Sequence, residues 1–265
     1  MPYQSHGALV EPQNQNARLW RYMDFARFLS VLDKRALFFP SVATLSAADP
    51  YEGEPLLARI HAARRQGPDE LRRLRLECEV FAHLNFFNCW HMNDGESDAM
   101  WKVYLKASDG VAIQTTVARL IACFHNTSDE VYMGEVQYID HETFIPPPSL
   151  FRPTDYLFKR LAFQHEREVR VGTYRTDVHI EFFDEEGFVK TPAAGGITAE
   201  NILKYPETKG VYVDIDVPEL IDKVVVSPLS PDWFSDLVIS VSKKLGYDLE
   251  VIPSEMSRPS VLWQA

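Results

Sequence analysis

The chain has 265 residues, 46% hydrophobic and 25% charged, which is sufficient for the core of one large domain. Its formal net charge of −11 argues against unaided, tight binding to duplex DNA or to an anionic membrane. Its three cysteines form no C-x-x-C pair, so we expect no disulfides. No apolar run approaches the roughly 20 residues that span a bilayer, and we expect a cytoplasmic protein.

The first part of the chain alternates strands and helices. Residues 1–16 are polar and include two prolines, so we expect a loosely ordered lead-in without a secretion signal. A short strand is predicted over 18–22. Asp24 then makes a good N-cap for an amphipathic helix over 25–32, whose apolar residues recur at helical spacing. A second strand over 36–39 stops at the proline that follows.

The composition becomes helical and charged over residues 55–84. Apolar residues recur at helical spacing on both sides of Gly67-Pro68, which breaks the pattern. We therefore predict a helical hairpin inserted into a mainly β framework.

A strand and a capped helix are expected after this hairpin. The strand covers 85–90 and leads into a polar turn. Ser97 is placed to cap a helix over 100–104, whose aromatic side chains we expect in the core. Gly110 is expected to mark the end of that helix.

The second half of the chain is predicted to contain more strands than helices. Strands are expected at 111–116, 130–138, 211–215, 223–226 and 248–252. A short helix around 156–162 leads into an acidic strand, with which 179–183 is expected to pair. Residues 184–209 are predicted to be largely loop. The last helix is expected to open at Ser230-Pro231 and to close at Gly246.

The order of these elements bears on the fold class. Strands and helices are mixed without a repeated strand–helix unit, which favours an α+β fold over a doubly wound parallel sheet. We find no internal repeat and no low-complexity tract, and we expect a single domain over residues 1–265.

The acidic strand, within residues 163–172, is the most informative stretch. Alternation on a strand places Glu166, Glu168 and Arg170 on one face and the residues between them on the other. Two neighbouring carboxylates repel each other, which separates their pKa values and concentrates negative charge where a cation forms. The alternative interpretation is a solvated strand face on which Arg170 neutralises its neighbours.

Two further groups of residues are candidates for chemistry. Arg21, between Trp20 and Tyr22, offers a rigid fork of donors that suits a diphosphate, although an ordinary surface arginine has the same pattern. Cys89 and His91 are two residues apart on a predicted strand and form a potential thiolate–imidazole nucleophile. The alternative is a buried cysteine beside a histidine whose hydrogen bonds are satisfied.

Other binding motifs are weak in this chain. The turn-rich segment 41–52 is either the lining of a nucleotide pocket or a connecting loop. The histidines and cysteines show no metal-ligand spacing, and no glycine-rich loop that cradles phosphates is found. We therefore expect no metal.

Taken in order, these motifs resemble the arginine–serine–glutamate branch of the ADP-ribosyltransferase superfamily, whose members break NAD at the nicotinamide–ribose bond. The first motif of this resemblance is Leu19-Trp20-Arg21-Tyr22 with the helix that follows it. The second is Phe87-Asn88-Cys89-Trp90-His91, followed by a helix and by the glycine-led strand Gly110-Val111-Ala112-Ile113. The third is Glu166-Arg167-Glu168. It implies a mixed, mostly antiparallel split β-sheet core of that type, with peripheral helices and the inserted hairpin.

The chain also resembles, over most of its length, a bacterial family of unknown function. The shared features are the turn Asp49-Pro50-Tyr51-Glu52, the pair Met100-Trp101 and the pattern Lys159…Glu166-x-Glu168-x-Arg170.

The resemblance to the transferases implies roles for individual residues. Glu168 is expected to stabilise the positive charge that forms on the ribose and to hold a ribose hydroxyl, whereas Glu166 steers or deprotonates the acceptor. Arg21 is expected to grip the diphosphate of NAD.

The nicotinamide side of the site departs from the family. Three aromatic side chains are candidates to stack on the nicotinamide: Tyr22, Trp90 and Trp101. Cys89-Trp90-His91 stands where the family has hydroxyl residues. The missing polar contact to the ribose is expected from His91 or from a hydroxyl such as that of Ser41 or Ser46.

The implied function is the transfer of ADP-ribose from NAD, as a substrate, to a protein or nucleic-acid acceptor. The implied setting is a bacterial toxin or phage-defence effector, with a possible antitoxin partner and no membrane partner. One alternative is an inactive binding or toxin–antitoxin interaction module on the same scaffold, which the departure at residues 89–91 favours. The others are an NAD glycohydrolase, with water as the acceptor, and a hydrolase that uses Cys89 and His91.

Overall fold

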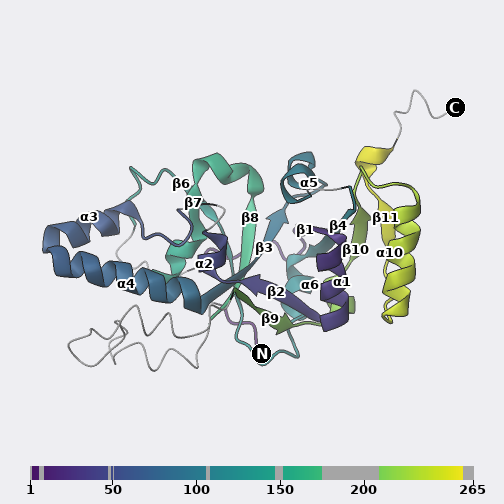
Figure 1. The fold of residues 1–265 in the computed structure, drawn as a ribbon, viewed down its shortest axis with the longest axis horizontal. Helices are drawn as coiled ribbons and strands as arrows, with labels where there is room; N and C mark the ends of the chain where they lie inside the picture. Colours follow the sequence, from purple (N-terminus) through teal and green to yellow (C-terminus); the bar gives the residue numbers. More distant parts are fainter. Residues whose placement is uncertain are drawn as a thin grey trace.

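A computed structural model describes residues 2–5, 9–46, 49, 51–105, 108–146, 152–174 and 209–258. Its centre is a seven-stranded sheet, mixed but mostly antiparallel, with β10 and β11 as the parallel neighbours (Figure 1). In order across the sheet, the strands are β11 (Val251–Pro253), β10 (Lys223–Val226), β4 (Gly110–Thr116), β1 (Arg18–Asp24), β3 (Asn85–Met92), β8 (Glu168–Tyr174) and β5 (Tyr132–Glu135). Together with the helices, this sheet confirms the predicted α+β class.

Within the described ranges, two small sheets and a set of helices surround the central sheet. The small sheets are the antiparallel pair β2 (Ala36–Pro40) with β9 (Gly210–Asp214) and the parallel pair β6 (Gln137–Ile139) with β7 (Phe158–Arg160). The α-helices are α1 (Phe25–Lys34), α2 (Val42–Leu45), α3 (Leu57–Gln66), α4 (Pro68–Leu84), α5 (Asp98–Tyr104), α6 (Val117–Ala122), α9 (Val217–Leu220) and α10 (Trp233–Lys244). The 3-10 helices are η1 (Arg152–Leu157), η2 (Leu161–Glu166) and η4 (Glu255–Ser257). In the part of the chain described, no helix is both long and apolar enough to cross a bilayer.

The central sheet is split where β1 meets β3. Seven residue pairs join β1 to β4 and seven join β3 to β8. Across the β1–β3 seam, in contrast, the register among the described residues is limited to Leu19 with Met92 and Trp20 with His91. Beyond Trp20 the two strands part, and the backbone groups that face the gap need other partners.

The two faces of β8 are used differently. Val169 and Val171 are fully buried in the main hydrophobic core, together with Phe86 and Trp90 of β3. Glu168 and Arg170 point to the opposite face, as alternation on a strand requires. The predicted opposition of the acidic and apolar residues is therefore confirmed for this strand.

The helix that follows β1 begins as the sequence predicts. The Asp24 carboxylate accepts a 2.8 Å hydrogen bond from the backbone nitrogen of Arg27, which satisfies one free donor of the first turn of α1. Phe28, Val31 and Leu32 form the buried face. This cap fixes the direction in which α1 leaves β1 and so places Arg27 beside the seam.

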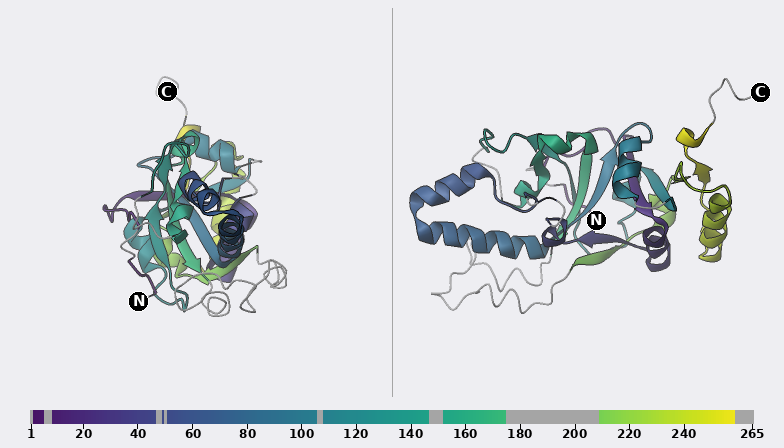
Figure 2. Two further views of the ribbon diagram at one scale, coloured as in Figure 1. Left: turned by 90° about the vertical axis from the view of Figure 1, so that its left-hand side faces the viewer. Right: turned by 45° about the horizontal axis from the view of Figure 1, so that its top comes forward.

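Helices α3 and α4 form the predicted hairpin. Gly67 adopts φ 125°, a conformation that glycine tolerates best, and Pro68 occupies the first turn of α4. Figure 1 and the right-hand view of Figure 2 place the hairpin at one end of the molecule and α10 at the other.

Two predictions of element bounds near the middle of the chain are wrong. Helix α5 ends at Tyr104, and Gly110 instead starts β4, where a Cβ atom would collide with the side chain of Leu105. The predicted strand 130–138 is two strands, β5 and β6. Between them, the backbone nitrogen of Val136 donates to Glu168 O at 2.9 Å, and β6 pairs with β7 in another sheet.

The segment before β8 and the last helix also differ from the prediction. In place of one helix over 156–162 there are η1, β7 and η2. Arg167 adopts φ 40°, which ends η2 and interrupts the alternation, so β8 begins only at Glu168. Helix α10 begins at Trp233 after Asp232, and β11 begins at Val251.

The described part of the lead-in is held against the sheet edge. Tyr3 forms a parallel bridge with Val131, and the backbone nitrogen of Glu135 donates to Val10 O at 2.7 Å. This differs from the expected loose order. The predicted strand 179–183 and nearly all of the predicted loop 184–209 lie outside the described residues.

Candidate functional site

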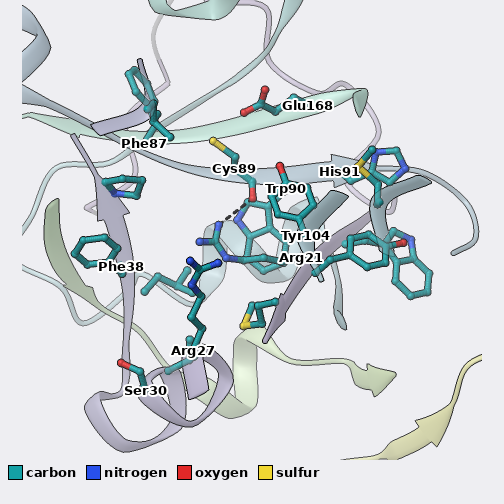
Figure 3. Close-up of a pocket in the computed structure, with 18 of the residues that line it drawn as sticks. Arg21, Arg27, Ser30, Phe38, Phe87, Cys89, Trp90, His91, Tyr104 and Glu168 are labelled. Atoms are coloured by element: carbon teal, nitrogen blue, oxygen red, sulfur yellow. Dashed lines mark hydrogen bonds between the residues drawn. The ribbon is translucent and has the colours of Figure 1, made fainter. Parts of the chain in front are cut away.

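A cavity of about 530 Å³ lies where β1 and β3 part (Figure 3). It is bordered by β1, α1, β2, α2, β3, α5, η2, β8 and β9. All the predicted site residues except Trp101 line it: Arg21, Tyr22, Cys89, Trp90, His91, Glu166 and Glu168. The arginine of the first strand and the two acids of the late segment therefore border the same space.

Arg21 fills the gap that the parting strands leave. Its Nη1 donates to Asn88 Oδ1 at 2.6 Å and to the backbone oxygen of Cys89 at 2.9 Å, and its guanidinium carbon lies 5.8 Å from the ring centroid of Trp90. Burial lowers the pKa of Arg21 from its ordinary value, but a guanidinium remains charged at neutral pH. Within the described ranges no carboxylate forms an ion pair with it. The cavity thus contains a cation held by neutral acceptors.

Asn88 is the residue that holds this arginine in place. It is fully buried, and its Nδ2 donates to the backbone oxygen of Phe38 at 2.9 Å while its Oδ1 accepts from Arg21. One amide therefore links β1, β2 and β3. Asn88 was not among the predicted site residues, because an asparagine in a strand carries no signal of this contact.

A second arginine lies on the same side of the cavity. Arg27, in the first turn of α1, lines the cavity, and its Nε lies 3.4 Å from Asp24 Oδ2 in an exposed pair. In Figure 3 its guanidinium group points toward that of Arg21. Two cations converge here, and they favour an anionic ligand group.

Glu168 lies at the other side of the cavity, in Figure 3 beyond Cys89. Its Oε1 accepts from Arg170 Nε at 2.9 Å, and its Oε2 accepts from Arg170 Nη2 at 3.1 Å and from Lys159 Nζ at 3.2 Å. Burial alone would raise its pKa, but the charges of Arg170 and Lys159 outweigh burial and lower the pKa to about 2. Glu168 is therefore ionised at neutral pH.

Glu166 reaches the cavity from η2, so the predicted strand position for this acid is wrong. It nevertheless lies beside Glu168, because Lys159 Nζ donates to Glu166 Oε2 at 2.5 Å as well as to Glu168. Burial raises the pKa of Glu166, which Lys159 only partly offsets. The pKa values of the two acids are therefore shifted in opposite directions, as a division between a fixed anion and a proton acceptor requires.

These acids belong to a buried ionic cluster that also contains Glu52. Arg170 Nη1 donates to the Glu52 carboxylate, and Glu52 Oε2 lies 4.0 Å from Lys159 Nζ. Three carboxylates face two cations, which leaves one net negative charge. The alternative interpretation of a solvated face is wrong because these side chains are buried, although Arg170 does neutralise Glu168.

Asp49 and Glu52 supply one acid to a neighbouring ion pair and one acid to this cluster. Asp49 Oδ1 accepts from Arg160 Nη2 at 2.7 Å, and the Arg160 guanidinium carbon lies 4.4 Å from the ring centroid of Tyr51. Glu52 binds Arg170. Ion pairs therefore connect Asp49 and Glu52 to strands β7 and β8, although about a hundred residues separate them in the sequence.

Cys89 and His91 do not form a nucleophilic pair. Burial and the neighbouring Glu168, to which the thiol hydrogen bonds, raise the pKa of Cys89 well above its usual range. His91 Nδ1 lies 2.5 Å from the backbone oxygen of Glu166, and burial lowers its pKa. No hydrogen bond joins Cys89 to His91 in the described structure. The thiol therefore stays protonated, which removes support for the Cys–His hydrolase.

The aromatic candidates separate into two groups. Tyr22 and Trp90 line the cavity, whereas Trp101 lies behind Tyr22 in an edge-to-face contact, with ring centroids 4.8 Å apart. Trp101 Nε1 donates to Glu96 Oε2 at 3.0 Å. Trp101 therefore supports Tyr22 from behind and does not itself line the cavity. Tyr104, which we expected in the core, instead lines the cavity and is 41% exposed.

The hydroxyls of Ser41 and Ser46, the candidates for the ribose contact, form hydrogen bonds with neighbouring residues of the chain. Ser41 caps α2 through Thr44, and Ser46 donates to the backbone oxygen of Ala43 at 2.9 Å. Among serine and threonine side chains, those of Ser30 and Thr44 line the cavity, and His91 lines it as well.

No group of three or more metal-ligating side chains occurs among the residues described. Comparisons with known proteins found no matching family model, no matching curated protein and no matching solved structure. The function must therefore be argued from the cavity itself.

Proposed function

We propose that the protein transfers ADP-ribose from NAD to a macromolecular acceptor, and that the cavity at the β1–β3 seam binds the NAD. The observation that carries this proposal is the position of Arg21, Glu166 and Glu168 on one cavity. The split sheet and the resemblance of the three strand motifs to the transferase superfamily support it further.

The charges of the cavity match those of NAD. The diphosphate of NAD is anionic, and Arg21 and Arg27 supply cations on one side. The nicotinamide of NAD is a pyridinium cation, and the ionised Glu168 lies on the other side. A ligand with both charges is therefore favoured in one orientation over the reverse.

The transfer step follows from this orientation. The nicotinamide–ribose bond breaks, its electron pair remains on the nicotinamide nitrogen, and positive charge develops on the ribose carbon. The fixed carboxylate of Glu168 stabilises that charge. A lone pair of the acceptor forms the new bond, and the acceptor proton moves to Glu166, whose raised pKa suits a proton acceptor.

The acceptor is proposed to be a protein or a nucleic acid, in a bacterial toxin or a phage-defence effector that is restrained by an antitoxin. The net charge of −11 disfavours tight binding to nucleic acid. Transfer requires only a transient encounter, so this charge does not select between the two acceptors.

The test is incubation with NAD labelled in its adenylate part, with and without bacterial extract. Label on a macromolecule only when extract is present supports the transferase. Free ADP-ribose without extract would identify water as the acceptor and thus an NAD glycohydrolase. If neither product forms and NAD does not bind in calorimetry, the proposal is wrong.

A second candidate function is a non-catalytic binding module. It is favoured by the hydrogen bonds that Glu168 already accepts from neighbouring cations. Both carboxylate oxygens already accept hydrogen bonds from Arg170, and one also accepts from Lys159. These cations reduce the negative charge that a developing ribose cation would meet. NAD binding without any labelled product would support this candidate.

A further inference from the structure

Two aromatic rings form a corner at the rim of the cavity. Phe38 of β2 and Tyr212 of β9 are register partners, with ring centroids 5.1 Å apart and ring planes inclined by 56°. Both line the cavity, and they are 36% and 47% exposed. Leu37 and Phe39, on either side of Phe38, are fully buried in the core. Alternation on β2 therefore turns the Phe38 ring away from the core and toward the cavity.

The surroundings hold these rings in position. Lys34 Nζ lies 4.8 Å from the centroid of the Tyr212 ring, and the Tyr212 hydroxyl is 3.5 Å from Ser30 Oγ. A Cβ atom at position 210 would overlap the Phe38 ring, so Gly210 leaves the space that this ring occupies. Contacts with Lys34 and Ser30, and the space beside Gly210, therefore hold the two rings of β2 and β9 in place.

The corner lies on the cationic side of the cavity. Ser30, which contacts Tyr212, is on α1 one turn after Arg27, and Figure 3 shows Phe38 on the same side of Glu168 as Arg21 and Arg27. A nucleotide carries a phosphate that suits the arginines and a planar base that suits the rings, and all four side chains line this one cavity. Aromatic rings bind nucleobases by stacking, which is worth about 1–3 kcal/mol per base.

We infer that Phe38 and Tyr212 form a base-stacking subsite for the purine of a nucleotide whose phosphate is held by Arg21 and Arg27. This inference rests on the proposed function for the identity of the full ligand, NAD. It requires no transfer step, so it is tested separately with fragments of the nucleotide.

The experiment compares AMP with ribose 5-phosphate, which carries the same phosphate and sugar without the base. We expect AMP to bind the unchanged protein more tightly in titration calorimetry. Phe38→Leu and Tyr212→Leu keep apolar bulk but remove the π face, and each should weaken AMP binding at least about fivefold. Binding of ribose 5-phosphate should not change. Tyr212→Phe, which keeps the ring, should retain the AMP affinity.

The control is Trp233→Leu, because Trp233 is 58% exposed on α10 and is not part of the cavity lining. Equal binding of the two compounds by the unchanged protein, no binding of either, or equal losses for both compounds in Phe38→Leu would overturn the inference. An AMP loss as large in Trp233→Leu would do the same. Selective AMP binding without transfer from NAD would contradict the proposed function and leave the subsite supported.

Discussion

Asn88 Oδ1 accepts a 2.6 Å hydrogen bond from Arg21 Nη1 across the place where β1 and β3 part. The acceptor is neutral, so the arginine keeps its full charge for a ligand. A carboxylate in the same position would form an ion pair and reduce that charge.

We therefore expect Asn88→Asp to weaken binding of NAD and of AMP, by about tenfold. The new carboxylate would compete with the ligand phosphate for Arg21 and would lose the donor that now reaches the backbone oxygen of Phe38. Titration calorimetry measures the effect. Unchanged affinity for both ligands would show that Arg21 does not contact the phosphate.

Arg21→Ala should weaken NAD binding more than Glu168→Gln does. Loss of a charged hydrogen-bonding partner costs about 1.5–3 kcal/mol, which corresponds to roughly a 10- to 150-fold change in Kd. In the proposed transfer step Glu168 acts mainly on the charge that forms on the ribose, so its substitution should change NAD affinity little. Calorimetry that shows equal losses in the two variants would contradict this division of roles.

Glu168→Gln should reduce transfer at least about a hundredfold and leave the fold intact. The amide keeps the shape of the carboxylate, and the remaining cluster of Glu52, Glu166, Lys159 and Arg170 has balanced charges. Single-turnover transfer and circular dichroism measure the two effects. Glu79→Gln, at an exposed position of α4, is the control. Transfer at the parent rate in Glu168→Gln would disprove the assignment.

Arg170→Met should destabilise the protein by about 3–5 kcal/mol. The substitution leaves two buried carboxylates, Glu52 and Glu168, without their main partner. Urea unfolding gives the free energy of unfolding. Arg72→Met removes an exposed pair with Asp69, in which the Arg72 side chain is 83% exposed, and should change stability by less than about 0.5 kcal/mol. Similar losses in the two variants would show that the cluster is not stabilising.

The stability of the protein should depend on pH through Glu168. Its pKa in the folded protein is about 2, below the ordinary value of 4.5, so its contribution is present above pH 4.5 and is lost as the pH falls toward 2. Glu166, whose pKa is raised, contributes with the opposite sign. Between about pH 6 and about pH 3, Glu168→Gln should lose less of its free energy of unfolding than the parent. The same decrease in both proteins would contradict the lowered pKa.

Local patterns predicted much of the fold. The cap at Asp24, the break at Gly67 and the alternation of Val169 and Val171 with Glu168 depend on neighbouring residues, and the structure has them as predicted. Boundaries failed where distant contacts decide them. The predicted strand 130–138, for example, divides where the backbone nitrogen of Val136 donates to Glu168 O and β6 pairs with β7.

The site was only partly predictable for the same reason. Arg21 and the two acids stood out as charged residues in apolar strands. The partners of the acids, Lys159 and Glu52, come from other elements, and no sequence spacing indicates that they meet. The position of Glu166 was missed because the left-handed Arg167 interrupts the strand pattern.

The parting of β1 from β3 has a mechanical consequence. Where only two residue pairs of the described sheet hold its halves together, a small rotation of one half against the other disturbs few backbone hydrogen bonds. Such a rotation would change the separation of Arg21 from Glu168, while the ladders on either side keep their register. The few backbone pairs at this seam would then decide how readily the cavity changes its width.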